Sequence, residues 1–237
     1  MRLLNWPNRV TLIRIGLLFV LVFLVYHQRI WARFLAAGLA VLVIVMDWLD
    51  GYLARKLKES TLFGGVLDIA GDRIIESVLW ICLADLRLVP IWIPIVVIAR
   101  DILTDSIRGY VLRFGYTAFG KKTMMRSRLG RFLTGSPVMR TSYAVLKALS
   151  FSLLLLLSAM QKLPAQWSIL PETWIRTGFI IGYWTAVITA AMCLIRGIPV
   201  ILEGSALIQE ADRRHANAKR ARNERPRRKQ GSRPKRM

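Results

Sequence analysis

Four aspartates with helical spacing are the residues of this chain best suited to chemistry. Asp47 and Asp50 are three residues apart, and Asp68 and Asp72 are four apart, so each pair shares one face of a helix. Four carboxylates in an apolar environment repel one another strongly unless a cation neutralises them. All-oxygen ligands favour a hard divalent ion, and two ions balance the charge better than one. The pattern therefore predicts a site that binds two ions, Mg²⁺ or Mn²⁺.

Glycines and an arginine accompany these aspartates. Gly51 and Gly64 allow close approach of a ligand, and Arg55 places a cation one turn beyond Asp50, which suits a phosphate. The alternative is a set of Asp–Arg pairs that only tie helices together. With Arg55 and Arg73 as the nearby arginines, that arrangement would leave buried charge uncompensated. We therefore expect a metal site with positions open for substrate phosphate oxygens.

The elements that position these residues are predicted to be membrane-spanning helices. Hydrophobic residues make up 54% of the 237 residues, and the mean hydropathy is +0.42, which excludes a disordered chain. The two cysteines lie in apolar runs and predict neither disulfides nor a cysteine metal site. Because a bilayer is crossed by about 20 apolar residues, the sequence predicts an all-α, polytopic membrane protein. Its six transmembrane helices are expected at 10–27, 34–53, 64–84, 89–110, 143–160 and 178–202. The second and third, joined by a short loop, should be antiparallel neighbours.

The basic residues predict the orientation of these helices. The chain has 35 Lys and Arg against 14 Asp and Glu, a net charge of +21. The basic residues concentrate at the start, in alternate loops and after residue 210, and basic loops remain cytoplasmic. We therefore expect a multi-pass protein of the cell (inner) membrane whose termini and acidic site are both cytoplasmic.

Three regions follow from this arrangement. Residues 1–9 are expected to form a short interfacial segment, which Pro7 separates from the first helix. Residues 10–204 would form the six-helix domain. Residues 205–237 are predicted to be a disordered basic cytoplasmic tail that is attracted to anionic lipid, with no specific nucleic-acid partner.

The segment between the first and last of these aspartates resembles the signature of the CDP-alcohol phosphatidyltransferase family. The pattern D-x2-D-G-x2-A-R-x8-G-x3-D-x3-D is matched by Asp47, Asp50, Gly51, Ala54, Arg55, Gly64, Asp68 and Asp72. The resemblance implies a six-helix membrane enzyme, usually a homodimer, with two divalent cations. Such enzymes transfer a phosphatidyl group from a CDP-linked lipid such as CDP-diacylglycerol to a polar alcohol and release CMP.

The same resemblance implies a role for each matched residue. The metal ligands would be Asp47, Asp50, Asp68 and Asp72. Asp72 would also be the catalytic base that takes the proton of the acceptor hydroxyl. The CDP-lipid would be bound by Gly51, Ala54, Arg55 and Gly64.

Two further segments are similar to the phosphatidylglycerophosphate synthase branch of this family, which implies glycerol 3-phosphate as acceptor. They are residues 5–14, with the sequence NWPNRVTLIR, and residues 98–101 followed by Arg108. A phosphate on the acceptor needs a cationic pocket. The candidate phosphate-binding residues are Arg100, Arg108, Arg140 and Lys147. Segment 114–141 is longer and more basic than this branch predicts, so inositol phosphate, inositol or serine stays open as acceptor.

The remaining charges of the predicted third and fourth helices are interpreted as ion pairs. Asp101 and Asp105 could hold acceptor hydroxyls, but pairing with Arg100 and Arg108 is favoured. Glu76 is expected to pair with Arg73 or with an arginine of the fourth helix.

Two other functions also use acidic membrane helices. A cation transporter should show an inverted repeat, but the last two predicted spans contain no acid. Aromatic prenyltransferases have two Asp-rich motifs that are far apart, whereas these motifs are adjacent. Cation transport is therefore kept as the alternative from a different class.

Overall fold

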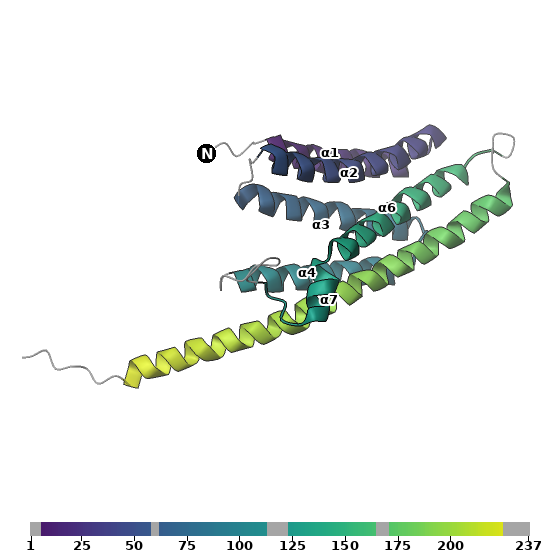
Figure 1. Cartoon of the computed structure of the whole chain (residues 1–237). Helices are drawn as coiled ribbons and strands as arrows, with labels where there is room; N and C mark the ends of the chain where they lie inside the picture. Colours follow the sequence, from purple (N-terminus) through teal and green to yellow (C-terminus); the bar gives the residue numbers. More distant parts are fainter. Residues whose placement is uncertain (1–5, 58–61, 113–122, 165–170, 225–237) are drawn as a thin grey trace, which may run out of the picture.

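The described part of the chain in the computed structural model consists of seven α-helices (Figure 1). It comprises residues 6–57, 62–112, 123–164 and 171–224, with side chains described except at 6–7, 47–57, 62, 214–216 and 218–224. The helices are α1 (Trp6–Tyr26), α2 (Ile30–Leu57), α3 (Leu62–Asp85), α4 (Trp92–Leu112), α5 (Arg128–Gly135), α6 (Pro137–Met160) and α7 (Glu172–Glu224). A helix therefore occupies each of the six predicted positions, and α5 is additional.

The beginning of α1 differs from the prediction. The helix starts at Trp6, so Pro7 lies in its first turn. Proline is tolerated there because an N–H group in the first turn has no partner within the helix. The expected break at Pro7 is therefore wrong, while residues 1–5 of the predicted interfacial segment lie outside the described residues.

The end of α7 also corrects the prediction, because the helix continues to Glu224 instead of giving way to a disordered tail at residue 205. Residues 205–224 are rich in Ala and Arg, which favour helix strongly. Leu207 is buried, and Glu210 pairs with Arg126 at 2.5 Å. Helix propensity and these contacts outweigh the high charge of this segment. The last thirteen residues, 225–237, lie outside the described part.

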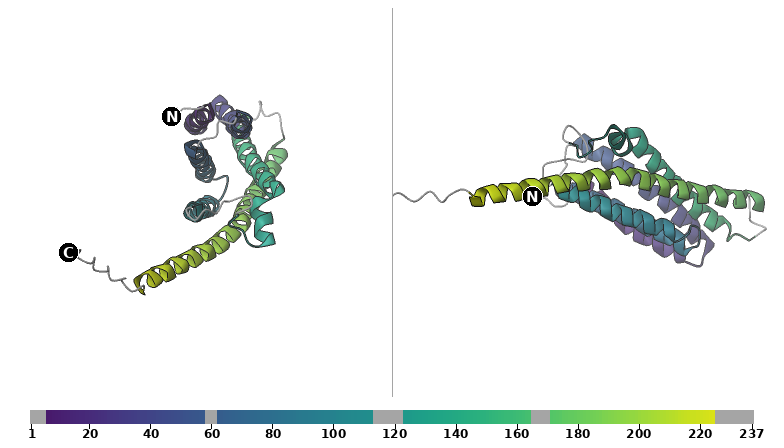
Figure 2. Two further views of the ribbon diagram at one scale, coloured as in Figure 1. Left: turned by 60° about the vertical axis from the view of Figure 1, so that its left-hand side comes forward. Right: turned by 90° about the horizontal axis from the view of Figure 1, so that it is seen from below.

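The helices pack around one main apolar core. α1 packs against α2 and α3, α2 also contacts α6, and α7 packs against α4 and α6 (Figure 2). Trp80 of α3 and Phe151 of α6 meet edge to face, with ring centroids 4.8 Å apart. Other core residues include Leu18, Leu21, Ala36, Ala40, Leu79, Leu83, Ile93, Val97, Leu154, Ala186 and Ala190.

The position of α1 changes the expected relation between α2 and α3. Over the described residues, the main contacts of α3 are with α1, α4 and α6, so α1 links the two motif helices. Gly71 permits this close approach, because a Cβ atom there would lie 2.7 Å from Cγ2 of Thr11. The two motif segments are thus held partly through a third helix.

Several of these helices have the length and composition of membrane spans. Among the described residues, three qualify on both grounds: Asn8–Tyr26, Pro137–Met160 and Glu172–Arg213. Ile30–Met46 is a shorter apolar helix, and α3 and α4 contain more charge. Many large apolar side chains are exposed, such as Phe19, Phe23 and Ile102, as expected where lipid surrounds a helix. The described part of the chain is therefore all-helical, and its apolar helices are those of a membrane protein.

Candidate active site

The predicted metal site is divided between the end of α2 and the beginning of α3. The helical backbone of α2 contains Asp47, Asp50, Gly51, Ala54 and Arg55, but their side chains lie outside the described residues. Gly64, Asp68 and Asp72 follow in the first turns of α3. Only residues 58–61 separate the two helices in the sequence, so the backbone positions of both aspartate pairs lie toward the same end of the bundle.

Whether the four carboxylates converge on metal ions stays a prediction. No group of three or more His, Cys, Asp or Glu side chains that could hold a metal occurs among the described side chains. That search does not include Asp47 or Asp50, which supply half of the predicted ligands. The chemistry of the donor set, carboxylate oxygens only, still fits Mg²⁺ or Mn²⁺.

Asp72, the predicted catalytic base, forms an ion pair with α1. Nη2 of Arg14 lies 3.1 Å from Oδ1 of Asp72. The Arg14 side chain is 2% exposed, whereas that of Asp72 is 43% exposed. Arg14 therefore fixes the direction of the carboxylate while leaving it accessible. The arginine belongs to the N-terminal segment that suggested the synthase branch, but no ion pair with Asp72 was predicted.

A set of charged side chains beside Asp72 connects α3, α4 and α6, and we call it the inner charge network. It comprises Arg73, Glu76, Arg100, Asp101, Asp105, Arg108 and Lys147. Arg73 is its centre, with nitrogens 2.6 Å from Asp105 and 3.0 Å from Asp101. These contacts hold α3 against α4 within an apolar bundle.

The pairing predicted for α4 is confirmed. Arg100 lies 2.6 Å from Asp101, and Arg108 lies 3.6 Å from Asp105. Glu76 contacts Arg73 at 3.6 Å, as one of the two expected alternatives.

Glu76 also has closer partners, which lie on α6. Its carboxylate is buried and accepts hydrogen bonds from Tyr143 Oη at 2.5 Å and Lys147 Nζ at 2.7 Å. The guanidinium of Arg196, on α7, stacks over the Tyr143 ring at 4.9 Å from its centroid. Glu76 thus links α3 to α6, and Tyr143 extends the contact to α7.

Arg196 is a candidate functional residue that the sequence interpretation missed. An arginine within an apolar span is a functional signal in itself, and Arg196 lies inside the predicted 178–202 span. The next residue, Gly197, lets α4 approach, because a Cβ atom there would lie 2.7 Å from Cγ and Nε of Arg100. Arg100 and Arg196 therefore belong to one region of the α4–α7 contact.

Positive charge is in excess in this region. With Arg196 included, five cationic side chains accompany three carboxylates, which leaves a surplus of two positive charges. The Nε atoms of Arg100, Arg108 and Arg196 are buried without a hydrogen-bond partner among the described groups. Such donors can bind an anion.

Three of the four predicted phosphate-binding residues thus come together. Arg100, Arg108 and Lys147 belong to the inner charge network. Arg140 is exposed on the first turn of α6, and none of the ion pairs above includes it.

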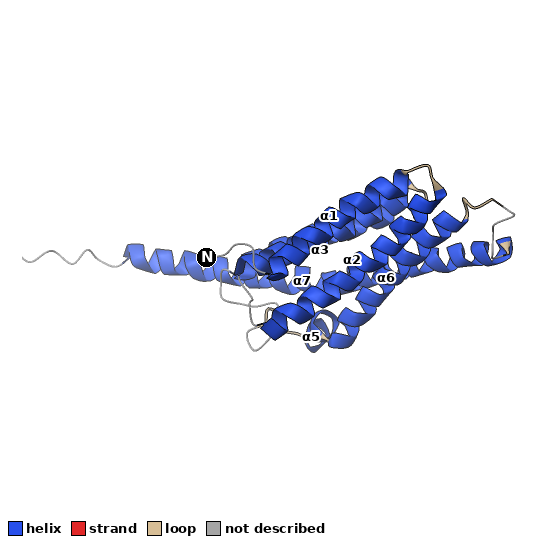
Figure 3. Ribbon diagram, turned by 90° about the horizontal axis from the view of Figure 1, so that it is seen from above, coloured by secondary structure: helices blue, strands red, loops and turns tan. Residues whose placement is uncertain are grey.

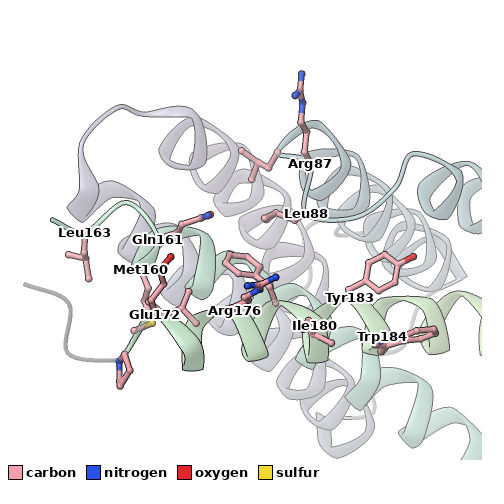
Figure 4. A pocket seen from close by; sticks show the side chains of 14 residues that line it. Arg87, Leu88, Met160, Gln161, Leu163, Glu172, Arg176, Ile180, Tyr183 and Trp184 are labelled. Carbon is pink, nitrogen blue, oxygen red and sulfur yellow. The ribbon is translucent and has the colours of Figure 1, made fainter. Parts of the chain in front are cut away.

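A large cavity at the opposite end of the bundle is unrelated to the aspartate motif. It measures about 1320 Å³, and its lining includes Arg87, Leu88, Gln161, Arg176 and Tyr183 (Figure 4). These residues follow the end of α3 or lie near the turn between α6 and α7, whereas the motif lies at the beginning of α3. The cavity therefore contributes nothing to the acidic site.

Comparison with known proteins agrees with the motif. The sequence profile of the CDP-alcohol phosphatidyltransferase family matches residues 4–192, most of the chain. The match includes α1 to α6 and the first part of α7, so the similarity extends far beyond residues 47–72.

Three curated relatives bear the name CDP-diacylglycerol–glycerol-3-phosphate 3-phosphatidyltransferase. The Pseudomonas fluorescens protein is 32% identical over 49% of this chain and 61% of its own length. The Bacillus subtilis strain 168 protein is 29% identical over 63% of this chain and 80% of its own. The Pectobacterium atrosepticum protein is 33% identical over 47% of this chain and 62% of its own. The alignment thus covers less than two thirds of the first and third relatives.

Proposed function

Because the chain belongs to the CDP-alcohol phosphatidyltransferase family, we propose that it transfers the phosphatidyl group of CDP-diacylglycerol to glycerol 3-phosphate. CMP is the second product. The aspartate motif and the names of three relatives support this reaction. Neither the family nor these relatives support cation transport, the alternative from a different class.

The acidic residues supply the reaction centre. The acceptor hydroxyl oxygen attacks the phosphorus that carries diacylglycerol, the bond to the CMP oxygen breaks, and Asp72 accepts the hydroxyl proton. Asp47, Asp50, Asp68 and Asp72 would hold two ions, Mg²⁺ or Mn²⁺, which would offset the negative charge of the diphosphate. Arg14 supports the role of Asp72 because it fixes the direction of the carboxylate.

The acceptor is assigned from the inner charge network. Its surplus of two positive charges, counted with Arg196, matches a phosphate dianion. This surplus is the structural observation that favours a phosphate-bearing acceptor, because inositol or serine would leave two positive charges uncompensated in an apolar bundle. We assign the acceptor phosphate to Arg100, Arg108, Arg140 and Lys147, and add Arg196.

We further infer six membrane crossings with the active site on the cytoplasmic side. At about 1.5 Å per residue, α3 and α4 are about 36 and 32 Å long, enough for a hydrocarbon core of about 30 Å. Their charges face each other, as the Arg73–Asp105 pair shows, which reduces the cost of placing them in a membrane. A cysteine introduced at Lys162 should react with a membrane-impermeant thiol reagent in intact cells, and one introduced at Gln209 only after permeabilisation.

Family resemblance also favours a homodimer, which a measurement of the mass of the purified protein can test.

The proposed reaction is tested by CMP release from CDP-diacylglycerol with a panel of acceptors. Glycerol 3-phosphate should support release, and inositol phosphate, inositol and serine should support much less. Asp72→Asn should retain CDP-diacylglycerol binding but lose about 10²–10⁴-fold in turnover, the usual contribution of a general base. Release with serine but not with glycerol 3-phosphate would refute the acceptor assignment. Absence of CMP release with every acceptor would refute the reaction.

A further inference from the structure

The short helix α5 presents three distinct faces. Gly130 and Thr134 are buried on the side that packs against α6 and α7. Leu129 and Phe132 are 66% and 54% exposed. At 100° per residue, these two apolar side chains lie on the side of the helix away from the buried pair. The basic face is formed by Arg128 and Arg131, both exposed.

The level of α5 relative to the bilayer follows from its junction with α6. Only Ser136 separates the two helices, and its N–H donates to the carbonyl of Phe132 at 3.1 Å. α6 is a candidate span of 24 residues, about 36 Å long, so its first turn lies at the boundary between hydrocarbon and water. α5 lies beside this first turn and therefore at the level of the lipid headgroups (Figure 3).

The other end of α5 is fixed to α7. The Glu203 carboxylate accepts hydrogen bonds from the backbone N–H groups of Arg126 and Ser127 and from the Ser127 hydroxyl. That hydroxyl in turn accepts from the N–H of Gly130 at 2.8 Å and caps the helix. Held at both ends, α5 cannot rotate to bury Leu129 against the protein.

We propose that α5 is a binding element for anionic phospholipid headgroups at the membrane interface. Leu129 and Phe132 insert at the boundary of the acyl chains, while Arg128 and Arg131 bind lipid phosphates. Charge complementarity supports an anionic partner, because α5 itself, residues 128–135, contains two arginines and no acid. The site is separate from the acceptor site, since none of its four residues is assigned to the acceptor phosphate.

A fluorescent probe at the apolar face tests this proposal in the full chain. Leu129→Cys is labelled with bimane, and Gln209→Cys, at an exposed position on α7, serves as the matched control. The native Cys82 and Cys193 are buried and do not compete for the label. Both proteins are placed in nanodiscs of phosphatidylcholine with or without phosphatidylglycerol. Quenching is measured with spin-labelled lipid and with acrylamide, whose neutrality avoids repulsion by the anionic surface.

Lipid quenching should be about twofold or more stronger at position 129 than at 209, and acrylamide quenching weaker. Phosphatidylglycerol should increase lipid quenching at 129, and Arg128→Gln with Arg131→Gln should abolish that increase. Equal acrylamide quenching at the two positions would overturn insertion of the apolar face. Headgroup binding would be overturned if phosphatidylglycerol did not change lipid quenching at position 129. It would also be overturned if the change persisted after both arginines were replaced.

Discussion

Replacing Glu76 by Gln isolates the charge that links α3 to α6. The amide keeps the size of the side chain and can still accept the hydrogen bond from Tyr143, which is 2.5 Å long in the native protein. It removes the negative charge that Lys147 faces at 2.7 Å and Arg73 at 3.6 Å. We expect Glu76→Gln to destabilise the protein because it leaves both cations undercompensated in an apolar bundle.

The expected size of this effect follows from burial. Removing one partner of a buried ion pair costs about 3–5 kcal/mol. Glu76 is 3% exposed but Lys147 is 24% exposed, so part of the unpaired lysine charge is solvated. We therefore expect the lower end, about 3 kcal/mol. For a chain of this length, that loss lowers Tm by about 6–12 °C.

The assay is unfolding of the purified protein in one detergent, followed by intrinsic fluorescence. Asp85→Asn is the matched control, because it makes the same carboxylate-to-amide change on α3. Asp85 is exposed and accepts one described hydrogen bond, from Tyr26 at 2.8 Å. Its replacement should change the free energy of unfolding by about 0.5 kcal/mol or less.

A double variant distinguishes loss of the ion pair from general damage. Lys147→Met alone should also destabilise, because it leaves Glu76 without its closest cation. If the two residues act as a pair, the double variant should be more stable than the sum of the single effects predicts, by about 1–2 kcal/mol. Additive effects, or a Glu76→Gln effect no larger than that of Asp85→Asn, would refute the reasoning.

Three further substitutions test the site by steady-state kinetics. Arg108→Ala should raise KM for glycerol 3-phosphate about 10- to 100-fold, which corresponds to the loss of one charged hydrogen bond. KM for CDP-diacylglycerol should change little. The reverse pattern would assign Arg108 to the site of the donor, CDP-diacylglycerol. Gly197→Ala should raise the acceptor KM because the added methyl group displaces Arg100; unchanged kinetics would show that the contact adapts. Arg14→Gln should lower kcat more than it raises either KM, because the direction of Asp72 is lost; a pure KM effect would contradict this role.

The six long helices were largely predictable because each contains an extended, mainly apolar segment, but their ends were not. α1 starts four residues before the predicted span and α7 ends 22 residues beyond it. Hydropathy marks the part of a helix that lies in lipid, whereas helix propensity and contacts such as Arg126–Glu210 determine how far it continues.

The eight-residue helix α5 was missed for a different reason. It is too short to produce an apolar run, and helices of this length form through tertiary contacts. A local signal was nevertheless present, since Ser127 is a favourable N-cap and apolar residues follow at 129, 132 and 133. Its attachment to Glu203, 76 residues later, could not be read from local sequence.

Ion pairs were predictable where spacing along one helix determines them. Arg108–Asp105 is an i,i+3 pair, and Arg100 and Asp101 are adjacent. The contact of Arg73 with Asp105 joins two helices, and its formation depends on how each helix is rotated. A single sequence does not specify that rotation, so the cross-helix contacts of Arg73 and Glu76 emerged only from the structure.

The rotation of α3 is what connects the network to catalysis. Asp68, Asp72 and Glu76 follow one another at four-residue intervals and therefore share one stripe of the helix. Glu76 is held by Lys147 from α6, and Asp72 is held by Arg14 from α1, so the stripe is fixed from two sides. One residue of rotation, 100°, would turn all three carboxylates away together. In the proposed reaction, Lys147 and Arg14 would orient the acids, and the Nε groups of Arg108 and Arg196, which have no hydrogen-bond partner among the described groups, would bind the acceptor phosphate.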